Sequence, residues 1–320
     1  MILKSLDIDD NQALIKGQPE SPNDYPILMP IRSGHHQRCL RAAPKSSILS
    51  QQTLNSPAPN RNDKKMEISA LASGSSGNCF YIEEDGKAVL IDAGISCKQI
   101  VGRLAGMKKN PENVKAIFIT HEHSDHTKGA DVFARNFKIP IFATKKTAKN
   151  CFLCSDDSLI RSIKNNETVS LNGLSVEAFS KPHLGEDPVS YNVINHKKIS
   201  VITDVGYASQ NIIDNVSDSD FLCIESNHDE MMLECGPYPY YLKKWIKGNY
   251  GHLSNLQASL CVLEHASSKL KNVILSHLSR TNNTPQMAFE TFRQLVKERR
   301  DLSPKIFVSS RETPTPLIKV

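Results

Sequence analysis

Four side chains of metal-binding type lie within one short segment, at His121, His123, Asp125 and His126. In an extended backbone, side chains two residues apart point to the same side, so His121 and His123 can bind one metal ion together. Asp125 and His126 follow at a predicted turn and can reach a second ion. Imidazole and carboxylate groups packed this densely would stay unpaired without a cation. The spacing therefore predicts a metal site with room for two ions.

The element that must position this cluster is the apolar run just before it. Residues Val114 to Ile119 are rich in β-branched and small apolar side chains, which is typical of a buried strand. The cluster would then lie on a loop at the end of that strand. Strand ends are places where a rigid scaffold can hold chemical groups.

Further candidate ligands stand where other apolar runs end. His183 follows one predicted strand, Asp204 ends another, and His277 ends the run VILS. Each residue alone would be ordinary at a strand end, but together they supply the ligands that the first cluster lacks. Asp92 also closes a predicted strand, where it either caps the next helix or supports the metal-binding loop through hydrogen bonds.

The remaining pattern is strand-rich at first and then alternates between strands and helices. Strands are predicted at 67–72, 79–84, 88–91, 114–119, 139–143, 174–179, 189–194, 199–203 and 221–224. Helices are predicted after Gly94 through Arg103, at 130–137, at 145–153, from Asn255, and from Pro285 towards Arg299.

Composition bounds the class of protein. No apolar run among the 320 residues reaches the length of a membrane span, and the start lacks the pattern of a signal peptide. We therefore expect a cytoplasmic protein with no membrane partner. The eight cysteines form no regular framework, which predicts reduced thiols. The net charge is +5, with a surplus of 3 in residues 1–65, so bulk charge does not reveal what the remainder binds.

The first 65 residues differ from the rest in amino-acid composition and in hydrophobic pattern. They are rich in Pro, Ser, Asn and Gln and lack periodicity from Gln18 to Lys65, which predicts a disordered extension at 1–65. Residues 66–320 would then form the folded domain. Because the first strand pattern begins at once, Met66 is a candidate for the true start. Mass spectrometry of the native N-terminus would decide.

Two polar segments could contact a substrate. The loop Ser73–Asn78, which contains Ser75, either presents backbone N–H groups to a phosphate or is a flexible turn. His228 either lines the site or pairs with Asp229.

Two later segments carry the same ambiguity. Arg280 and Asn282 either contact phosphates or help to cap the helix that follows. Residues 237–245 interleave aromatic and basic side chains, a composition suited to stacking against single-stranded bases. Aromatics at helical spacing are more often part of a core, and we expect core packing here.

The ordered set of candidate ligands resembles that of the metallo-β-lactamase superfamily, over nearly all of residues 66–320. The sequence around these ligands resembles the YycJ (WalJ) group of cytosolic hydrolases, in the segments LASGSSGNC, LIDAG, ITHEHSDH, ITDVG, ESNHDEMM, GPYP, GHLSN and SHLS. This resemblance implies an α/β fold: a four-layer αββα sandwich with the metal site at the edge of its two sheets.

The resemblance also implies a role for each candidate ligand. The first ion would be bound by His121, His123 and His183 and the second by Asp125, His126 and His277, with Asp204 bridging and Asp92 supporting the loop. Nitrogen and oxygen ligands without Cys suit two divalent metal ions, Zn²⁺ or Mn²⁺. Two ions roughly 3.5 to 4 Å apart activate water and stabilise charge on a phosphoryl oxygen.

Glu225 and His252 complete the catalytic candidates, with Asp125. Glu225 follows the strand at 221–224, and His252 lies in GHLSN ahead of a helix. They resemble the acidic and histidine elements of tRNA 3′-processing nucleases, where a carboxylate-oriented His protonates the leaving oxygen. A capping hydrogen bond at the helix start is the alternative.

The function implied by the resemblance is that of a dinuclear metal-dependent phosphodiesterase acting on nucleic acid, specifically a 5′-to-3′ DNA exonuclease linked to DNA repair. Two alternatives stay open: a hydrolase of a small ester, thioester or lactam, and a non-catalytic metal-binding regulatory protein. The complete ligand set argues against the last, because decayed members would be expected to lose ligands first. Oligomeric state cannot be read from the sequence.

Overall fold

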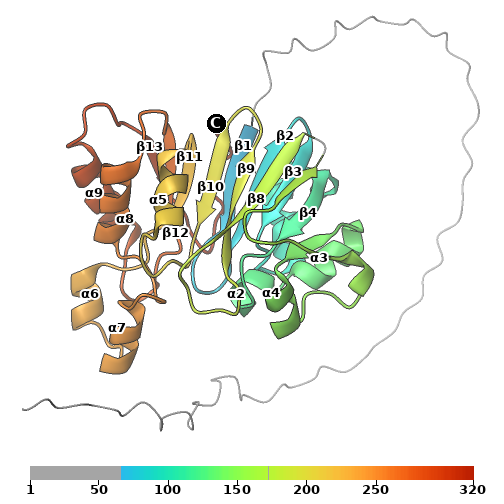
Figure 1. The fold of residues 1–320 in the computed structure, drawn as a ribbon, viewed down its shortest axis with the longest axis horizontal. Helices are drawn as coiled ribbons and strands as arrows, with labels where there is room; N and C mark the ends of the chain where they lie inside the picture. The colour runs from blue at the N-terminus through green and yellow to red at the C-terminus, as the bar shows by residue number, and fades with distance from the viewer. Residues whose placement is uncertain (1–65, 172) are drawn as a thin grey trace, which may run out of the picture. The chain divides into compact units, whose positions relative to one another are not determined.

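The computed structural model describes residues 66–171 and 173–320, so the extension predicted at 1–65 lies outside the described residues. Two β-sheets with flanking helices make up the described region (Figure 1). One sheet has the strand order β14-β1-β2-β3-β4-β5-β6, and the other has the order β13-β12-β11-β10-β9-β8-β7. None of the helices in these residues is long and apolar enough to cross a membrane.

The elements have the following bounds. The first sheet contains β1 (Met66–Ala72), β2 (Cys79–Glu84), β3 (Lys87–Ile91), β4 (Val114–Phe118), β5 (Ile141–Ala143), β6 (Ile160–Ser162) and β14 (Ile318–Lys319). The second contains β7 (Thr168–Leu171), β8 (Leu174–Ser180), β9 (Val189–Ile194), β10 (Lys198–Ile202), β11 (Phe221–Glu225), β12 (Asn272–Ser276) and β13 (Lys305–Val308). The α-helices are α1 (Cys97–Gly106), α2 (Ser124–Thr127), α3 (Ala130–Phe137), α4 (Lys145–Asn150), α5 (Gln210–Ser217), α6 (Glu230–Cys235), α7 (Tyr240–Ile246), α8 (Asn255–His265) and α9 (Pro285–Val296).

Apolar side chains divide between three buried layers because successive residues of a strand point to opposite faces. Ile68 of β1 packs between the sheets, in one cluster with Tyr191 of β9. Leu71 faces the other way, in a cluster with Phe133 of α3. A third cluster covers the outer face of the second sheet and includes Phe292 of α9. The domain is therefore the four-layer αββα sandwich that the family resemblance implied.

Parallel pairing brings many strand ends to one edge of the sandwich. In the second sheet, β10, β11 and β12 are parallel neighbours, with Glu225 opposite Ser276. In the first sheet, β3 and β4 are parallel, with Ile91 opposite Phe118. Loops that follow parallel strands leave from the same edge, and this edge is where ligands bind in open α/β sheets.

The predicted central strands agree with the structure to within about two residues, but the edge strands were not predicted. β6, β7, β13 and β14 are the outermost strands of the two sheets. They are short and partly exposed, so their apolar pattern is weak. Helices α5, α6 and α7 were also missed. The loop after β4 proved to contain the short helix α2, and α4 ends at Asn150 rather than at 153.

Candidate metal centre

The loop after β4 is held from below by Asp92, which follows β3. One carboxylate oxygen of Asp92 accepts the Thr120 backbone N–H at 2.8 Å. The other lies 2.7 Å from Nδ1 of His126, and both of these side chains are fully buried. Asp92 therefore fixes the start of the loop and turns the Nε2 atom of His126 away from the sheet.

A second contact holds the helical part of the loop. Asn78 donates its backbone N–H to the Asp125 carbonyl at 2.7 Å and its side-chain amide to the Asp125 carboxylate at 3.2 Å. A Cβ atom on Gly94 would lie 1.6 Å from that same carbonyl oxygen. Only glycine allows so close an approach, so Gly94 and Asn78 set the position of Asp125.

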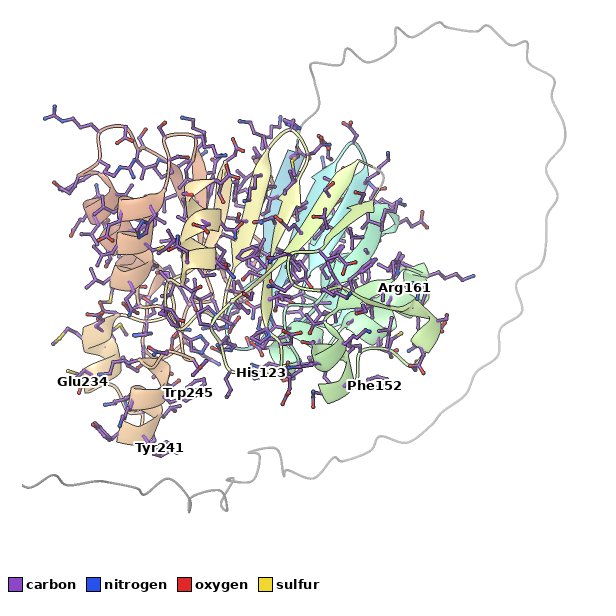
Figure 2. All side chains as sticks on the ribbon, in the orientation of Figure 1. His123, Phe152, Arg161, Glu234, Tyr241 and Trp245 are labelled. Atoms are coloured by element: carbon purple, nitrogen blue, oxygen red, sulfur yellow. The ribbon has the colours of Figure 1, made fainter. Side chains whose placement is uncertain are left out.

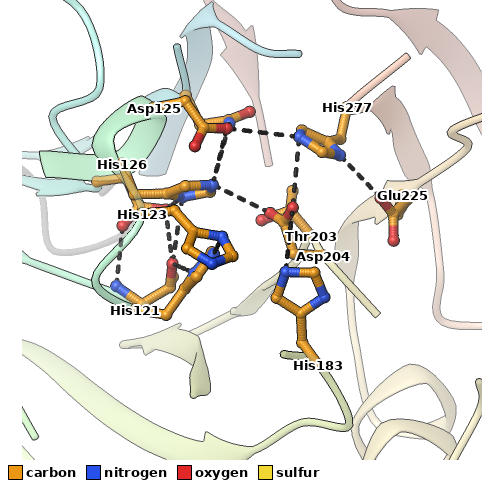
Figure 3. Close-up of polar contacts among 12 residues, drawn as sticks. His121, His123, Asp125, His126, His183, Thr203, Asp204, Glu225 and His277 are labelled. Atoms are coloured by element: carbon orange, nitrogen blue, oxygen red, sulfur yellow. Dashed lines mark hydrogen bonds and ion pairs between the residues drawn. The ribbon is translucent and has the colours of Figure 1, made fainter. Parts of the chain in front are cut away.

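All seven predicted metal ligands converge at one edge of the two sheets (Figure 3). Their ligand atoms form groups in which all atoms lie within 4.8 Å of one another. These groups include His121–His123–His183, His121–His126–Asp204 and Asp125–His126–His277.

Asp204, which follows β10, lies between these groups. Its carboxylate oxygens lie 3.2 Å from Nε2 of His126, 3.4 Å from Nε2 of His277 and 3.9 Å from Nε2 of His183. The geometry therefore offers two adjacent sites with one carboxylate between them.

The backbone is strained at three of the strand ends that form this cluster. Asp92, Asp204 and His277 have positive φ angles of 61°, 56° and 56°. A left-handed residue other than glycine costs on the order of 1 kcal/mol or more and persists only where its surroundings enforce it. The sharp turn aims each side chain back across the strand ends and into the cluster.

The histidines of the first group are held in the form that binds metal ions. Burial lowers the pKa of His121 well below its usual range and lowers the pKa of His183 to about 3. Their imidazoles are therefore neutral at pH 7, as metal ligation requires.

The second group carries the opposite electrostatic signature. Burial lowers the pKa of His277, but the carboxylates of Asp204, Asp125 and Glu225 outweigh it and raise that pKa to about 10. Burial likewise lowers the pKa of His126, and Asp125, Asp92 and Asp204 raise it well above its usual range. The carboxylates thus favour positive charge at the centre of the cluster, which divalent cations would supply.

Buried polar atoms in the cluster point to the same conclusion. Nε2 of His183, Nε2 of His277 and one carboxylate oxygen of Asp204 are buried and make no hydrogen bond. Native proteins rarely leave such atoms without a partner. A nitrogen and oxygen donor set of this kind fits divalent metal ions.

Comparison with known proteins identifies the family. The family model of the metallo-β-lactamase superfamily matches residues 72–183. Exodeoxyribonuclease WalJ of Streptococcus pneumoniae is 36% identical over 265 residues, which covers 79% of this chain and 98% of that protein. The chain belongs to the metallo-β-lactamase superfamily. It is accordingly a metal-dependent hydrolase, and divalent metal ions are its cofactors.

Other similarities agree with this assignment. Exodeoxyribonuclease YycJ of Bacillus anthracis is 34% identical over 240 residues, covering 73% of this chain and 90% of that protein. The crystal structure of the metallo-β-lactamase fold protein YhfI from Bacillus subtilis superimposes with a TM-score of 0.58 at 12% identity, covering 78% of this chain and 99% of that chain. The second similarity concerns the fold alone.

The cluster of candidate ligands is extended on one side by Glu225 and His252. One carboxylate oxygen of Glu225 lies 2.8 Å from Nδ1 of His252 and 2.8 Å from Nδ1 of His277. The other oxygen accepts the Val205 N–H at 2.7 Å. Glu225 is fully buried, whereas the His252 side chain is 13% exposed. Burial raises the pKa of Glu225, but His252 and His277 outweigh it and lower that pKa to about 2. An ionised Glu225 therefore orients both imidazoles.

The aromatic segment near His252 is not part of a core, and that expectation was wrong. Tyr240 and Tyr241 on α7 are 79% and 72% exposed. The Trp245 ring is also exposed and meets the His252 ring edge-on, with 5.6 Å between centroids. Figure 2 shows Tyr241, Trp245 and His123 in the lower half of the view. These rings contact little because α7 is short and buries only Ile246.

The predicted substrate contacts fall into two groups by exposure. Ser75 and Arg280 are exposed. Asn78, His228 and Asn282 are buried. Asn78 holds the Asp125 loop, and the Asn282 side chain lies against the backbone at Gly236. These three side chains are at most 1% exposed, and their role as substrate contacts stays a prediction.

Three supporting residues of the cluster were not identified from the sequence. Lys181 is buried and donates to the Thr203 carbonyl at 2.8 Å, directly before Asp204. The hydroxyl of Ser73 accepts the His277 N–H at 2.8 Å. Thr120 lies against both Asp92 and His121. Thr120 and Lys181 lie within two residues of a predicted ligand, and Ser73 lies in the segment LASGSSGNC. Each of the three contacts a residue that is remote in sequence.

Proposed function

We propose that this hydrolase is a dinuclear phosphodiesterase that degrades DNA from the 5′ end. One observation carries the proposal: exodeoxyribonuclease WalJ matches this chain along 98% of its own length. The proposal includes a cytoplasmic location. The seven cysteines in the described part of the chain are all free, which fits a reducing compartment.

The grouping of the candidate ligand atoms supports the ligand sets that the family resemblance implies. One ion is assigned to His121, His123 and His183, the other to Asp125, His126 and His277, with Asp204 shared. The donor set suits zinc or manganese. When bound, two such ions lower the pKa of a water molecule and stabilise charge on a phosphoryl oxygen.

The chain's own residues would position the reacting groups. Because Glu225 engages Nδ1 of His252, the Nε2 atom of His252 is left to face the cluster edge. We assign to this atom the proton that the leaving oxygen takes up as the phosphodiester bond breaks. Glu225 acts as a positioning residue, since it is fully buried and touches no solvent.

The surface beside the cluster suits a nucleic-acid strand. Tyr241 and Trp245 expose their rings on α7, and Lys244 between them is also exposed. Exposed aromatic rings interleaved with positive charge stack bases and attract the phosphate backbone. A small ester or lactam would not require such a surface.

The test is degradation of end-labelled single- and double-stranded DNA and RNA by the metal-loaded protein. We expect shortening of DNA from the 5′ end, and loss of this activity in an Asp125→Ala, His126→Ala variant. Nitrocefin and an acyl thioester serve as parallel substrates. Turnover of either small molecule with intact DNA would remove the nuclease proposal, as would DNA degradation that persists unchanged in the double variant.

A further inference from the structure

A cavity lies beside the metal cluster and is not part of it. It has a volume of about 230 Å³. It lies past the ends of β12 and β13 and at the start of α9, and its lining includes Ser73, Leu278, Arg280, Thr284, Ser309 and Arg311. Ser73 joins the two sites, because its hydroxyl accepts the backbone N–H of His277 at 2.8 Å.

Two arginines give this cavity its charge. Arg280 is exposed and forms no hydrogen bond or ion pair with any residue in 66–171 or 173–320. Arg311 is half-buried, and its pKa is lowered by burial and by the nearby charge of Arg280, against the opposing effect of Glu312. The carboxylate of Glu312 also lines the cavity and offsets one of these two positive charges. The charge that remains is positive, and it suits an anion.

The buried hydroxyl of Ser309 is independent evidence for a ligand. Ser309 is only 4% exposed, and its Oγ atom has no hydrogen-bond partner. Its backbone is fixed, because its N–H donates to the Leu275 carbonyl at 2.9 Å. A buried hydroxyl is normally satisfied, and this one lines the cavity. An acceptor oxygen of a ligand in the cavity would complete it.

The walls of the cavity are built rather than incidental. Arg103 of α1 donates to the Arg311 carbonyl at 2.8 Å and so holds the loop that carries Arg311. Gly74 has a φ of +141°, and a Cβ atom there would lie 2.7 Å from Nε of Arg311. Thr284 caps α9, whose twelve residues direct the positive end of the helix dipole to this side.

We infer that this cavity binds a phosphate group of the nucleic-acid strand, so this inference rests on the proposed function. Its volume is below the roughly 300 Å³ at which pockets for larger organic ligands begin, so it suits a phosphate with part of its sugar rather than a base. Through Ser73, the bound phosphate would set the distance between the strand and the metal cluster. The phosphate is either the 5′-terminal one or an internal one.

The experiment compares the full-length, metal-loaded protein with Arg280→Gln and Ser309→Ala variants. Arg300→Gln is the matched control, since Arg300 is an exposed arginine beyond the far end of α9. KM and kcat are measured on short DNA strands with a 5′-phosphate or a 5′-hydroxyl, and binding of inorganic phosphate is measured by calorimetry.

We expect Arg280→Gln to raise KM for DNA by roughly 10- to 100-fold, the range for loss of a charged hydrogen bond. Ser309→Ala should raise it by a smaller factor, with kcat little changed in both variants and both parameters little changed in Arg300→Gln. An increase limited to 5′-phosphorylated strands identifies the terminal phosphate. An equal increase on both strands identifies an internal phosphate.

Unchanged KM in Arg280→Gln, with DNA still degraded, overturns the phosphate site and leaves the nuclease proposal intact. If the wild-type protein degrades no DNA, the proposed function fails. The phosphate site is then tested only by the calorimetric binding of inorganic phosphate. Loss of a phosphate-binding event in Arg280→Gln but not in Arg300→Gln then supports a phosphate site. Identical phosphate binding by the wild-type protein, Arg280→Gln and Arg300→Gln overturns the phosphate site.

Discussion

Replacing Glu225 with Gln tests how one buried carboxylate serves two imidazoles. The same oxygen of Glu225 lies 2.8 Å from Nδ1 of His252 and from Nδ1 of His277. Gln keeps the shape but removes the charge. A hydrogen bond to a charged group contributes about 1.5–3 kcal/mol and a neutral one about 1 kcal/mol, so each contact should weaken by about 0.5–2 kcal/mol.

The two contacts lead to two separate losses. Weaker orientation of His277 should lower metal affinity by about 2- to 30-fold, which is the same weakening expressed as a ratio of binding constants. Weaker orientation of His252 should lower kcat by up to about 30-fold at saturating metal, which is less than the whole contribution of general acid catalysis. His252→Ala should lower kcat without loss of metal.

The assay combines metal content, measured by mass spectrometry after dialysis in a metal buffer, with kcat on DNA. Because Glu225 and His252 act through one hydrogen bond, the double variant should lose less kcat than the product of the single losses. Wild-type metal content and kcat in Glu225→Gln would refute the shared-carboxylate reasoning. Metal loss from His252→Ala equal to that of Glu225→Gln would show that His252 is itself a ligand.

Three further predictions concern stability and the metal loop. Gly94→Ala should lower the thermal midpoint and the metal content together, because its Cβ would lie 1.6 Å from the Asp125 carbonyl oxygen. Gly102→Ala in α1 is the control: a Cβ there has nothing within 4 Å, so neither the midpoint nor the metal content should fall. Asp131→Asn should lower the midpoint at pH 7 by roughly 1–2 °C. The hydrogen bond from Arg135 lowers the pKa of Asp131, so its stabilisation is present above an unfolded pKa of about 4 and is lost as pH falls through the lower folded value. A wild-type-to-variant difference that grows below pH 4 would contradict this sign. Removal of metal with a chelator should lower the thermal midpoint of the wild-type protein, and addition of Zn²⁺ or Mn²⁺ should restore it. An unchanged midpoint would show that the folded state binds no metal.

The central strands and the ligand cluster could be predicted because their signals are local. A buried strand shows an apolar run of a few residues, and its end is marked by a change to polar side chains, as at Asp204 and His277. The edge strands β6, β7, β13 and β14 could not be predicted in this way. Each is partly exposed and gains its place from a neighbour, so its own residues carry little pattern.

The sequence by itself determined which residues are chemically able to bind metal and the order in which they occur. It also indicated the superfamily, because ligand type and spacing within one loop depend on only a few neighbouring residues. The sharing of Glu225 between His252 and His277 was decided by tertiary structure, since it requires β11 to lie beside β12 in parallel register. The same holds for the burial of Asn282, the exposure of Tyr241 and the cavity beside Ser73. Each depends on which distant segments pack together, and Ser73 and His277 meet across 204 residues of chain.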